Sequence, residues 1–256
     1  MRDKKVDVGI TYHEQAESIA IKAGIAEGCP TSGETNSTPC AAFRDHFYLV
    51  GPRDNKPGLR EGDAVVEMFV TLYNAAEKGL ARFLSRFDKS ATNIKDSELW
   101  IRIGQVPWAT NYSKWYHQYM AYPQEALKAA VALEEFTITD RGTYLTLREA
   151  DEALAEKTRI YKSGDENDAQ ELLNPANMII TANSARKERA RQFVEWVQGS
   201  EGQSVIDCFA KGKYCLYKSA IPSEYSEPRC PCIWELPEQQ SYPTSSLEQS
   251  YLGPKT

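Results

Sequence analysis

The sequence predicts an α/β protein built from strand–helix–strand units, and three observations support this prediction. Short apolar or alternating segments recur along the chain, and segments with apolar residues at three- and four-residue spacing follow several of them. Gly and Pro residues separate these segments. The chain has 256 residues, of which 41% are hydrophobic, so it can bury a core in one large domain or two small lobes.

Three predicted strands in the first part of the chain are each followed by a predicted helix. The strands are expected at Val6–Thr11, Phe43–Val50 and Ala81–Leu84. The first two helices have apolar stripes and are expected at His13–Ala23 and Asp63–Lys78. The third helix follows a polar loop and stops at Gly104, and its apolar positions are Ile94, Leu99, Trp100 and Ile103.

The second part of the chain continues this alternation. Helices are expected at Gln124–Glu135, at Arg186–Gln198 and after a capping box at Ser200–Gln203. Strands are expected at Phe136–Ile138 and Met178–Thr181, and a strand or an irregular edge is expected at Ala155–Tyr161. A turn at Asp140–Gly142 precedes a helix start at Tyr144–Arg148.

Aromatic side chains are concentrated in Val106–Tyr122. They are Trp108, Tyr112, Trp115, Tyr116, Tyr119 and Tyr122. We expect them to form core or an interface between lobes, because buried aromatics are commoner than ligand platforms, and stacking on a ligand is the alternative.

Composition limits the partners of the chain. The formal net charge is −6, which argues against general nucleic-acid binding, because that function needs a basic surface. No apolar run approaches the roughly 18 residues of a membrane-spanning helix. The first residues, MRDKKVDVGITY, lack the apolar segment of a secretory signal.

The chain has six cysteines, and their even number and short spacings favour disulfides and an oxidising compartment. Cys29 and Cys40 bracket a loop without large apolar side chains, which a disulfide would hold together. Free thiols are the alternative, and zinc is disfavoured because Cys230-Pro-Cys232 has the wrong spacing. The Asn36 and Asn111 triplets are weak additional support for secretion.

Motifs for catalysis are absent from the sequence. It contains no dinucleotide or P-loop glycine pattern and no nucleophile elbow. The three histidines are isolated from one another, so neither a catalytic residue nor a metal site is assigned. A binding protein therefore fits better than an enzyme.

The stretch Ser85–Trp100 is the best candidate for a ligand site. A polar loop feeds the start of a helix, where free backbone N–H groups and the positive end of the helix dipole attract anions. Hydroxyl groups and Arg86 in this loop would complete a seat for a small anion. The alternative is an N-capped surface helix with solvated charges.

Several segments resemble the tungstate-binding members of the periplasmic solute-binding proteins, in their two-lobed (type II) class. They include VDVGITYHEQAE, FRDHFYLVGPRDNKPGL, FLSRFDKSATNIKDSELW, FTITDRGTYLTL, LLNPANMIIT and FVEWVQGSEGQSVI. The match spans roughly residues 5–210, and its SRxDxSxT and DRGTYL patterns are fairly specific.

The resemblance implies a two-lobed fold with mixed sheets flanked by helices. Residues 1–50 would form a partial first lobe, 51–175 the second lobe, 176–236 the return with the closing helices, and 237–256 a flexible tail. The ligand-binding residues would be Arg86, Ser85, Ser90, Thr92 and Asn93, with Asp88 and Lys89 in supporting positions. No cofactor is implied, since the ligand is a tungstate or molybdate oxyanion.

The chain departs from the family pattern at several places. Phe87 and Ala91 stand where the family has glycine, and Asn93 stands where it has histidine. A Cβ at the glycine positions could block the approach of backbone to ligand. The family's first strand–helix unit has no counterpart here, so we expect an incomplete first lobe and a signal peptide upstream of Met1. The additional cysteines and the tail suggest a eukaryotic secreted relative, such as a fungal one.

The sequence thus predicts a secreted, monomeric oxyanion-binding protein that closes its two lobes on the ligand. In bacterial relatives the partner of such a protein is a membrane transporter. The alternative is a secreted interaction protein that keeps the fold and has lost the anion, with Trp108–Tyr122 as its contact surface.

Overall fold

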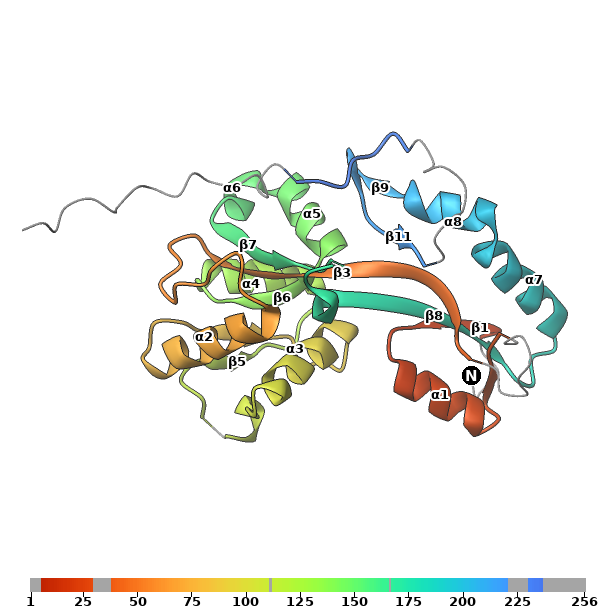
Figure 1. Ribbon diagram of the computed structural model, residues 1–256, viewed down its shortest axis with the longest axis horizontal. Coiled ribbons are helices and arrows are strands. Elements are labelled where there is room, and N and C mark those ends of the chain that lie inside the picture. The colour runs from red at the N-terminus through yellow and green to blue at the C-terminus, as the bar shows by residue number, and fades with distance from the viewer. Residues whose placement is uncertain (1–5, 30–37, 111, 166, 221–229, 237–256) are drawn as a thin grey trace, which may run out of the picture.

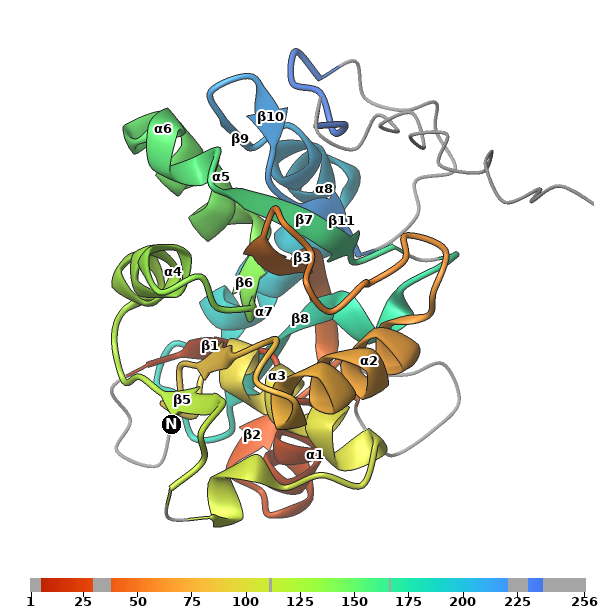
Figure 2. The same ribbon diagram turned by 90° about the vertical axis from the view of Figure 1, so that its left-hand side faces the viewer.

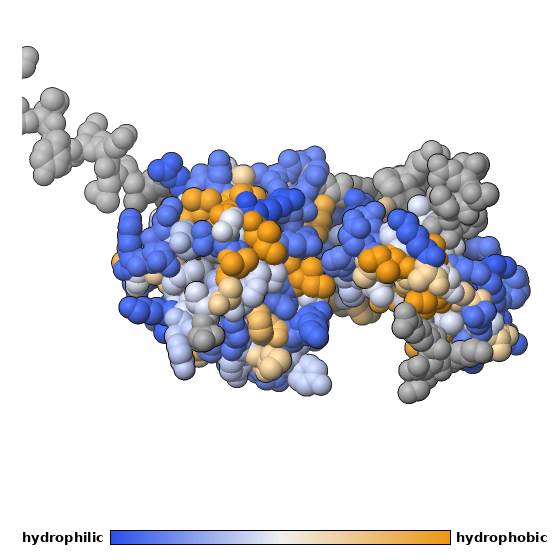
Figure 3. Space-filling view, turned by 90° about the horizontal axis from the view of Figure 1, so that it is seen from below, coloured by the Kyte–Doolittle hydropathy of each residue, from blue (hydrophilic) through white to orange (hydrophobic). Residues whose placement is uncertain are grey.

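The computed structural model describes residues 6–29, 38–110, 112–165, 167–220 and 230–236. The two predicted glycosylation sites and the predicted tail lie outside these ranges. The chain forms a two-lobed α/β structure, and one long strand, β3 (Cys40–Pro52), runs through both lobes (Figure 1). Viewed from below in Figure 3, the lobes are two masses joined side by side.

The first lobe is organised around the first half of β3. This half pairs antiparallel with β8 (Leu173–Thr181), and β8 pairs with β1 (Val8–Thr11) and β2 (Ala26–Glu27). Three helices belong to this lobe: α1 (Glu14–Lys22), α7 (Lys187–Gln198) and α8 (Ser200–Asp207). Its core is formed by Cys40, Ala42, Ala176, Met178, Ile180, Ala190, Val194 and Val197.

The second lobe is organised around the other half of β3, which pairs with β6 (Thr137–Asp140) and β7 (Thr158–Ser163). Alternate residues of β3 supply two cores, because successive side chains of a strand point to opposite faces. Phe47 and Leu49 pack with α2 and α3, whereas Tyr48 and Val50 pack with α4 and α5. These helices are α2 (Val65–Glu77), α3 (Ala91–Arg102), α4 (Pro123–Ala132) and α5 (Arg141–Ala150).

The remaining elements of the described ranges are short. A parallel pair, β4 (Phe83–Ser85) and β5 (Tyr116–Gln118), lies beside α3, and α6 (Glu152–Ala155) follows α5 (Figure 2). Single 3₁₀ turns occupy Pro107–Ala109 and Gln170–Leu172. Near the C-terminal end are β9 (Ala210–Lys211), β10 (Tyr214–Cys215) and β11 (Lys218–Ser219). No helix in the described ranges is both long and apolar enough to cross a membrane.

Three local predictions are wrong. Asp140–Gly142 is not a free turn, because the Asp140 carboxylate accepts a hydrogen bond from the Thr143 amide at 2.7 Å and begins α5. Ala155 ends helix α6 and is not part of a strand; β7 starts at Thr158.

The predicted capping box at Ser200 is the third error. The N-cap of α8 is Gly199, and no side chain caps that helix. Gln203 is buried and donates instead to the carbonyl oxygens of Ala42, at 2.9 Å, and Val197, at 2.7 Å. The Gln203 side chain, which the local pattern assigned to the capping box, therefore makes tertiary hydrogen bonds instead.

The cysteine prediction is confirmed. Disulfides join Cys29 to Cys40, Cys208 to Cys230 and Cys215 to Cys232, so no thiol is free. The aromatic segment is divided between core and surface. Trp115 and Tyr116 are buried in the core with α2 and α3, whereas Tyr112 and Tyr122 are 95% and 81% exposed.

Candidate functional site

The loop between β4 and α3, residues 86–90, forms the candidate anion site. Ser90 is the N-cap of α3, and its hydroxyl oxygen accepts a hydrogen bond from the Asn93 amide at 3.3 Å. Within the described part of the chain, no hydrogen bond uses the amide N–H of Ala91 or Thr92. The start of α3 therefore offers two backbone donors at the positive end of the helix dipole.

Arg86 adds a positive charge beside these donors. Its Nη2 pairs with Asp88 at 2.5 Å, and Asp88 also accepts from the Ser90 amide at 3.0 Å. Partial burial opposes the charge on Asp88, but hydrogen bonds from Ser90 and the Arg86 guanidinium outweigh it and lower the pKa of Asp88. The Arg86 Nε is buried and has no hydrogen-bond partner among the described residues. A buried guanidinium N–H without an acceptor is unfavourable. An anion that accepted a hydrogen bond from this Nε would therefore bind more tightly.

A small cavity of about 10 Å³ lies against Arg86. Its other walls are Thr92, residues 137–140 of β6, and Pro123, Ala126 and Leu127 of α4. This volume is enough for about one water molecule. The cavity is therefore too small for a tetrahedral oxyanion in this conformation, and Arg86 would have to shift for its Nε to reach one.

Ser85 and Asn93 lie beneath the loop. Ser85 is fully buried and donates to Asp96 at 2.7 Å, and the Asn93 amide donates to the Ser85 hydroxyl at 3.2 Å. The Asn93 side-chain oxygen accepts from the Lys89 amide at 3.1 Å. Burial raises the pKa of Asp96 to about 7, although hydrogen bonds from Ser85, Ser97 and Asn93 oppose the shift. This network holds the loop in place.

The two family glycine positions have different backbone conformations. Phe87 has φ of +49°, a left-handed conformation that favours glycine. Ala91 is the first residue of α3 and packs against the core of the second lobe. Its methyl group therefore points into the protein, and the expected obstruction of the ligand does not arise there.

A group of acidic and phenolic side chains at the junction of the lobes was not predicted. Asp45, in the middle of β3, is buried, and the His46 amide donates to its carboxylate at 2.8 Å. Burial first, and the negative charge of Asp140 second, raise the pKa of Asp45 to about 7. Burial, Asp45 and Asp140 likewise raise the pKa of Tyr12.

Tyr12 follows β1 of the first lobe, and Asp140 ends β6 of the second. Asp140 also lines the cavity against Arg86, so this group places the candidate site near the junction of the lobes. The only sign of this group in the sequence was Asp45, a charged residue inside the predicted strand Phe43–Val50.

Asp45 predicts a specific dependence of stability on pH. Its pKa in the folded protein, about 7, is higher than that of an exposed aspartate, about 4. Between these two pKa values the folded protein binds more protons than the unfolded chain. The free energy of unfolding therefore falls as the pH rises from about 4 to about 7. Asp45→Asn is expected to raise the free energy of unfolding at pH 8 by on the order of 2 kcal/mol and to change it little at pH 4.

Urea unfolding of both proteins at the two pH values measures this difference. The matched control is Asp54→Asn, since Asp54 is half-exposed and pairs with Lys56 at 3.0 Å. An equal effect of Asp45→Asn at both pH values would contradict the assignment.

Residues for metal binding do not assemble in the described ranges: no group of three or more His, Cys, Asp or Glu side chains is placed to hold an ion. His117 pairs with Glu135 at 3.0 Å, and His13 caps α1. The loop of residues 86–90 thus provides hydrogen-bond donors, the Arg86 charge paired with Asp88, and the exposed Lys89, which suit a small anion.

Similar proteins are known both by sequence and by structure. No family model matches the sequence. The tungstate-binding protein TupA of Peptoclostridium acidaminophilum is 28% identical over 218 residues, which are 83% of this chain and 67% of that protein. The chain spans between 46% and 67% of the length of the curated relatives it matches.

Solved structures extend the comparison. A periplasmic protein with a provisional metal-binding assignment is 46% identical, with a TM-score of 0.79 and 87% of this chain and 80% of that chain covered. Tungstate-binding protein TupA of Desulfovibrio alaskensis G20 shares the fold, with 21% identity, a TM-score of 0.68 and 85% and 80% of the two chains covered. The chain therefore belongs to the family of two-lobed periplasmic solute-binding proteins that includes the tungstate-binding proteins.

Proposed function

We propose that this protein binds a tungstate or molybdate oxyanion between its lobes, at the start of α3. The observation that carries the proposal is the buried Nε of Arg86, which has no partner in the described part of the chain and lies beside the open start of a helix. The named tungstate-binding relatives support the choice of ligand.

Each residue of the loop has a proposed role. Arg86 supplies the charge, and the amides of Ala91 and Thr92 supply backbone donors. The Ser90 hydroxyl accepts from the Asn93 amide and caps α3, and its side chain also hydrogen-bonds Asp88, so Ser90 shapes the loop. Asp88 orients Arg86, and the exposed Lys89 attracts anions from solution. Ser85 and Asn93 act from beneath by holding the loop.

The wider setting follows from the family. We place the protein outside the cell as a monomer, where its disulfides would be stable. Delivery of the anion to a membrane transporter is the role that the resemblance to bacterial solute-binding proteins implies. The function is binding and release, with no cofactor and no reaction.

A thermal-shift titration with tungstate, molybdate, sulfate and phosphate tests the proposal. An anion at about 100 times its dissociation constant stabilises the folded state by about 2.7 kcal/mol, which raises the melting temperature measurably. We expect a shift with tungstate or molybdate and none with sulfate or phosphate. The absence of any shift would contradict anion binding and leave the fold with an interaction role.

A further inference from the structure

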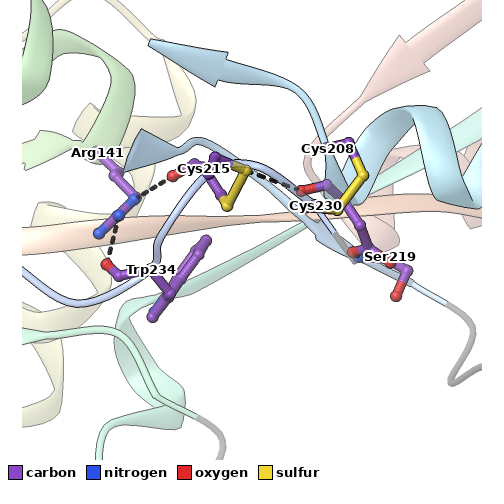
Figure 4. Close-up of a disulfide and its surroundings, with 8 residues drawn as sticks. Arg141, Cys208, Cys215, Ser219, Cys230 and Trp234 are labelled. Carbon is purple, nitrogen blue, oxygen red and sulfur yellow. Dashed lines mark hydrogen bonds between the residues drawn. A yellow bond between two sulfur atoms is a disulfide. The ribbon is translucent and has the colours of Figure 1, made fainter. Parts of the chain in front are cut away.

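The C-terminal part of the chain connects the two lobes. We call residues 208–220 and 230–236 the C-terminal clasp. Disulfides Cys208–Cys230 and Cys215–Cys232 fasten its two segments to each other (Figure 4). In Figure 1 the clasp lies above β3, between α5 and α8, whereas α1 and α3 lie below β3.

One end of the clasp is attached to the first lobe. Strand β11 pairs with β3 at Phe43 and Arg44. The Arg44 guanidinium donates to the Ser219 carbonyl from Nε at 3.0 Å and from Nη2 at 2.7 Å. The Ser219 amide donates to Asp207, at the end of α8, at 2.6 Å. This end therefore moves with the first half of β3.

The other end is attached to the second lobe through Arg141, the first residue of α5. Arg141 is 1% exposed, and its guanidinium donates to the Cys215 carbonyl at 2.7 Å and the Trp234 carbonyl at 2.6 Å (Figure 4). It also donates to the Tyr48 hydroxyl. Leu216 and Leu236 of the clasp are buried in the core that Tyr48 shares with α4 and α5. A buried, fully bonded guanidinium and two core leucines make this attachment rigid.

Trp234 lies at the point where β3 passes from one lobe to the other. His46 is the last residue of β3 paired with β8, and Phe47 is the first paired with β6. The Trp234 ring centroid is 4.6 Å from that of His46, 4.1 Å from the Arg141 guanidinium carbon and 4.8 Å from the Lys218 Nζ. The indole therefore lies against His46 at the pivot, against Arg141 of the second lobe, and against Lys218 of β11, the clasp strand that pairs with the first half of β3.

His46 fits this packing because it stays neutral. Burial first, and then the charges of Lys218 and Arg141, lower the pKa of His46 to about 3. A neutral imidazole packs edge-on against the indole as an aromatic ring, while the cations of Arg141 and Lys218 lie over the indole ring.

We propose that the C-terminal clasp is a third connection between the lobes, and that Trp234 fixes the angle between them. The crossing of β3 and the return into β8 are the two connections through which a hinge would bend. A clasp anchored in both lobes opposes that bending. The angle between the lobes then stays close to one value before the ligand binds. Binding therefore costs less free energy, because the lobes do not have to be ordered relative to each other.

The test measures the distance between the lobes without any ligand, so it does not depend on the proposed anion. Spin labels on noncanonical residues replace Lys22 of α1 and Ile101 of α3, which are exposed. Pulsed electron paramagnetic resonance is expected to give one narrow distance distribution. Trp234→Ala is expected to broaden it and add a longer-distance population, whereas Trp234→Phe keeps it narrow because a ring remains on the pivot.

Two further variants make the result decisive. Trp196→Ala removes a half-exposed ring from α7, outside the clasp, and should leave the distribution narrow. Joint replacement of Cys208, Cys215, Cys230 and Cys232 by Ala removes both disulfides of the clasp without leaving a free thiol there, and should broaden the distribution even if Trp234→Ala does not fold. A distribution that stays narrow in folded Trp234→Ala, or in the folded variant that lacks both clasp disulfides, overturns the proposal.

Discussion

Replacing Arg86 with alanine is expected to weaken tungstate binding by about 100-fold, which corresponds to roughly 3 kcal/mol. The guanidinium supplies the charged donor of the site, and its Nε is the buried group without a partner in the described ranges. Its loss also leaves the Asp88 carboxylate without its cationic partner, although the hydrogen bonds from Ser90, which lower the pKa of Asp88 more, remain. Isothermal titration of wild type and variant with tungstate measures the change.

Arg82→Ala is the matched control for this experiment. Arg82 lies just before β4, is half-exposed and pairs with Glu135 at 3.5 Å, away from the loop that carries Arg86. Its removal lowers the net charge of the protein by the same amount, so an effect of general electrostatics would appear in both variants. Wild-type affinity in the Arg86 variant would show that the anion binds elsewhere.

Replacing Trp100 with alanine is expected to lower the free energy of unfolding by about 4 kcal/mol, which is the range of large core truncations. Trp100 is fully buried, and its ring centroid lies 4.7 Å from that of Phe69, 5.1 Å from that of Phe83 and 5.2 Å from that of Trp115. These contacts hold α3 against α2 and β4. The loss should therefore weaken anion binding as well, because α3 carries the amides of the site.

Chemical denaturation with urea measures this loss, and two variants calibrate it. Trp100→Phe keeps a ring in the core and should cost less than the alanine variant. Trp196→Ala removes a ring that is 45% exposed and should cost about 1 kcal/mol or less. If Trp100→Ala cost no more than Trp196→Ala, the packing described for the second lobe would be wrong.

Much of the fold was predictable because local patterns and tertiary structure agree. The apolar stripe of Asp63–Lys78 predicted α2, observed at Val65–Glu77, within two residues at its start and one at its end. The alternating segment at Phe43–Val50 predicted β3, although the strand extends to Cys40 and Pro52. Asp140 was misjudged because aspartate favours both turns and helix N-caps, and only the packed α5 decides between them.

The local structure of the loop that carries the candidate site was predictable, but the contacts beneath the loop were not. A polar loop before a helix start can be recognised from its residues, and the structure places Arg86, Asp88 and Ser90 together there. The burial of Ser85 depends on Asp96, which lies on α3 eleven residues along the chain. Cysteine spacing cannot give connectivity, so the clasp and the position of Trp234 at the pivot follow only from the three-dimensional structure.

The most direct test of the account is a calorimetric titration of the wild-type protein with tungstate, repeated in an excess of sulfate. The account predicts saturable heat from one site per chain, retained in sulfate because sulfate does not compete. No measurable heat with tungstate, or binding that sulfate displaces, would contradict a selective oxyanion site at the start of α3.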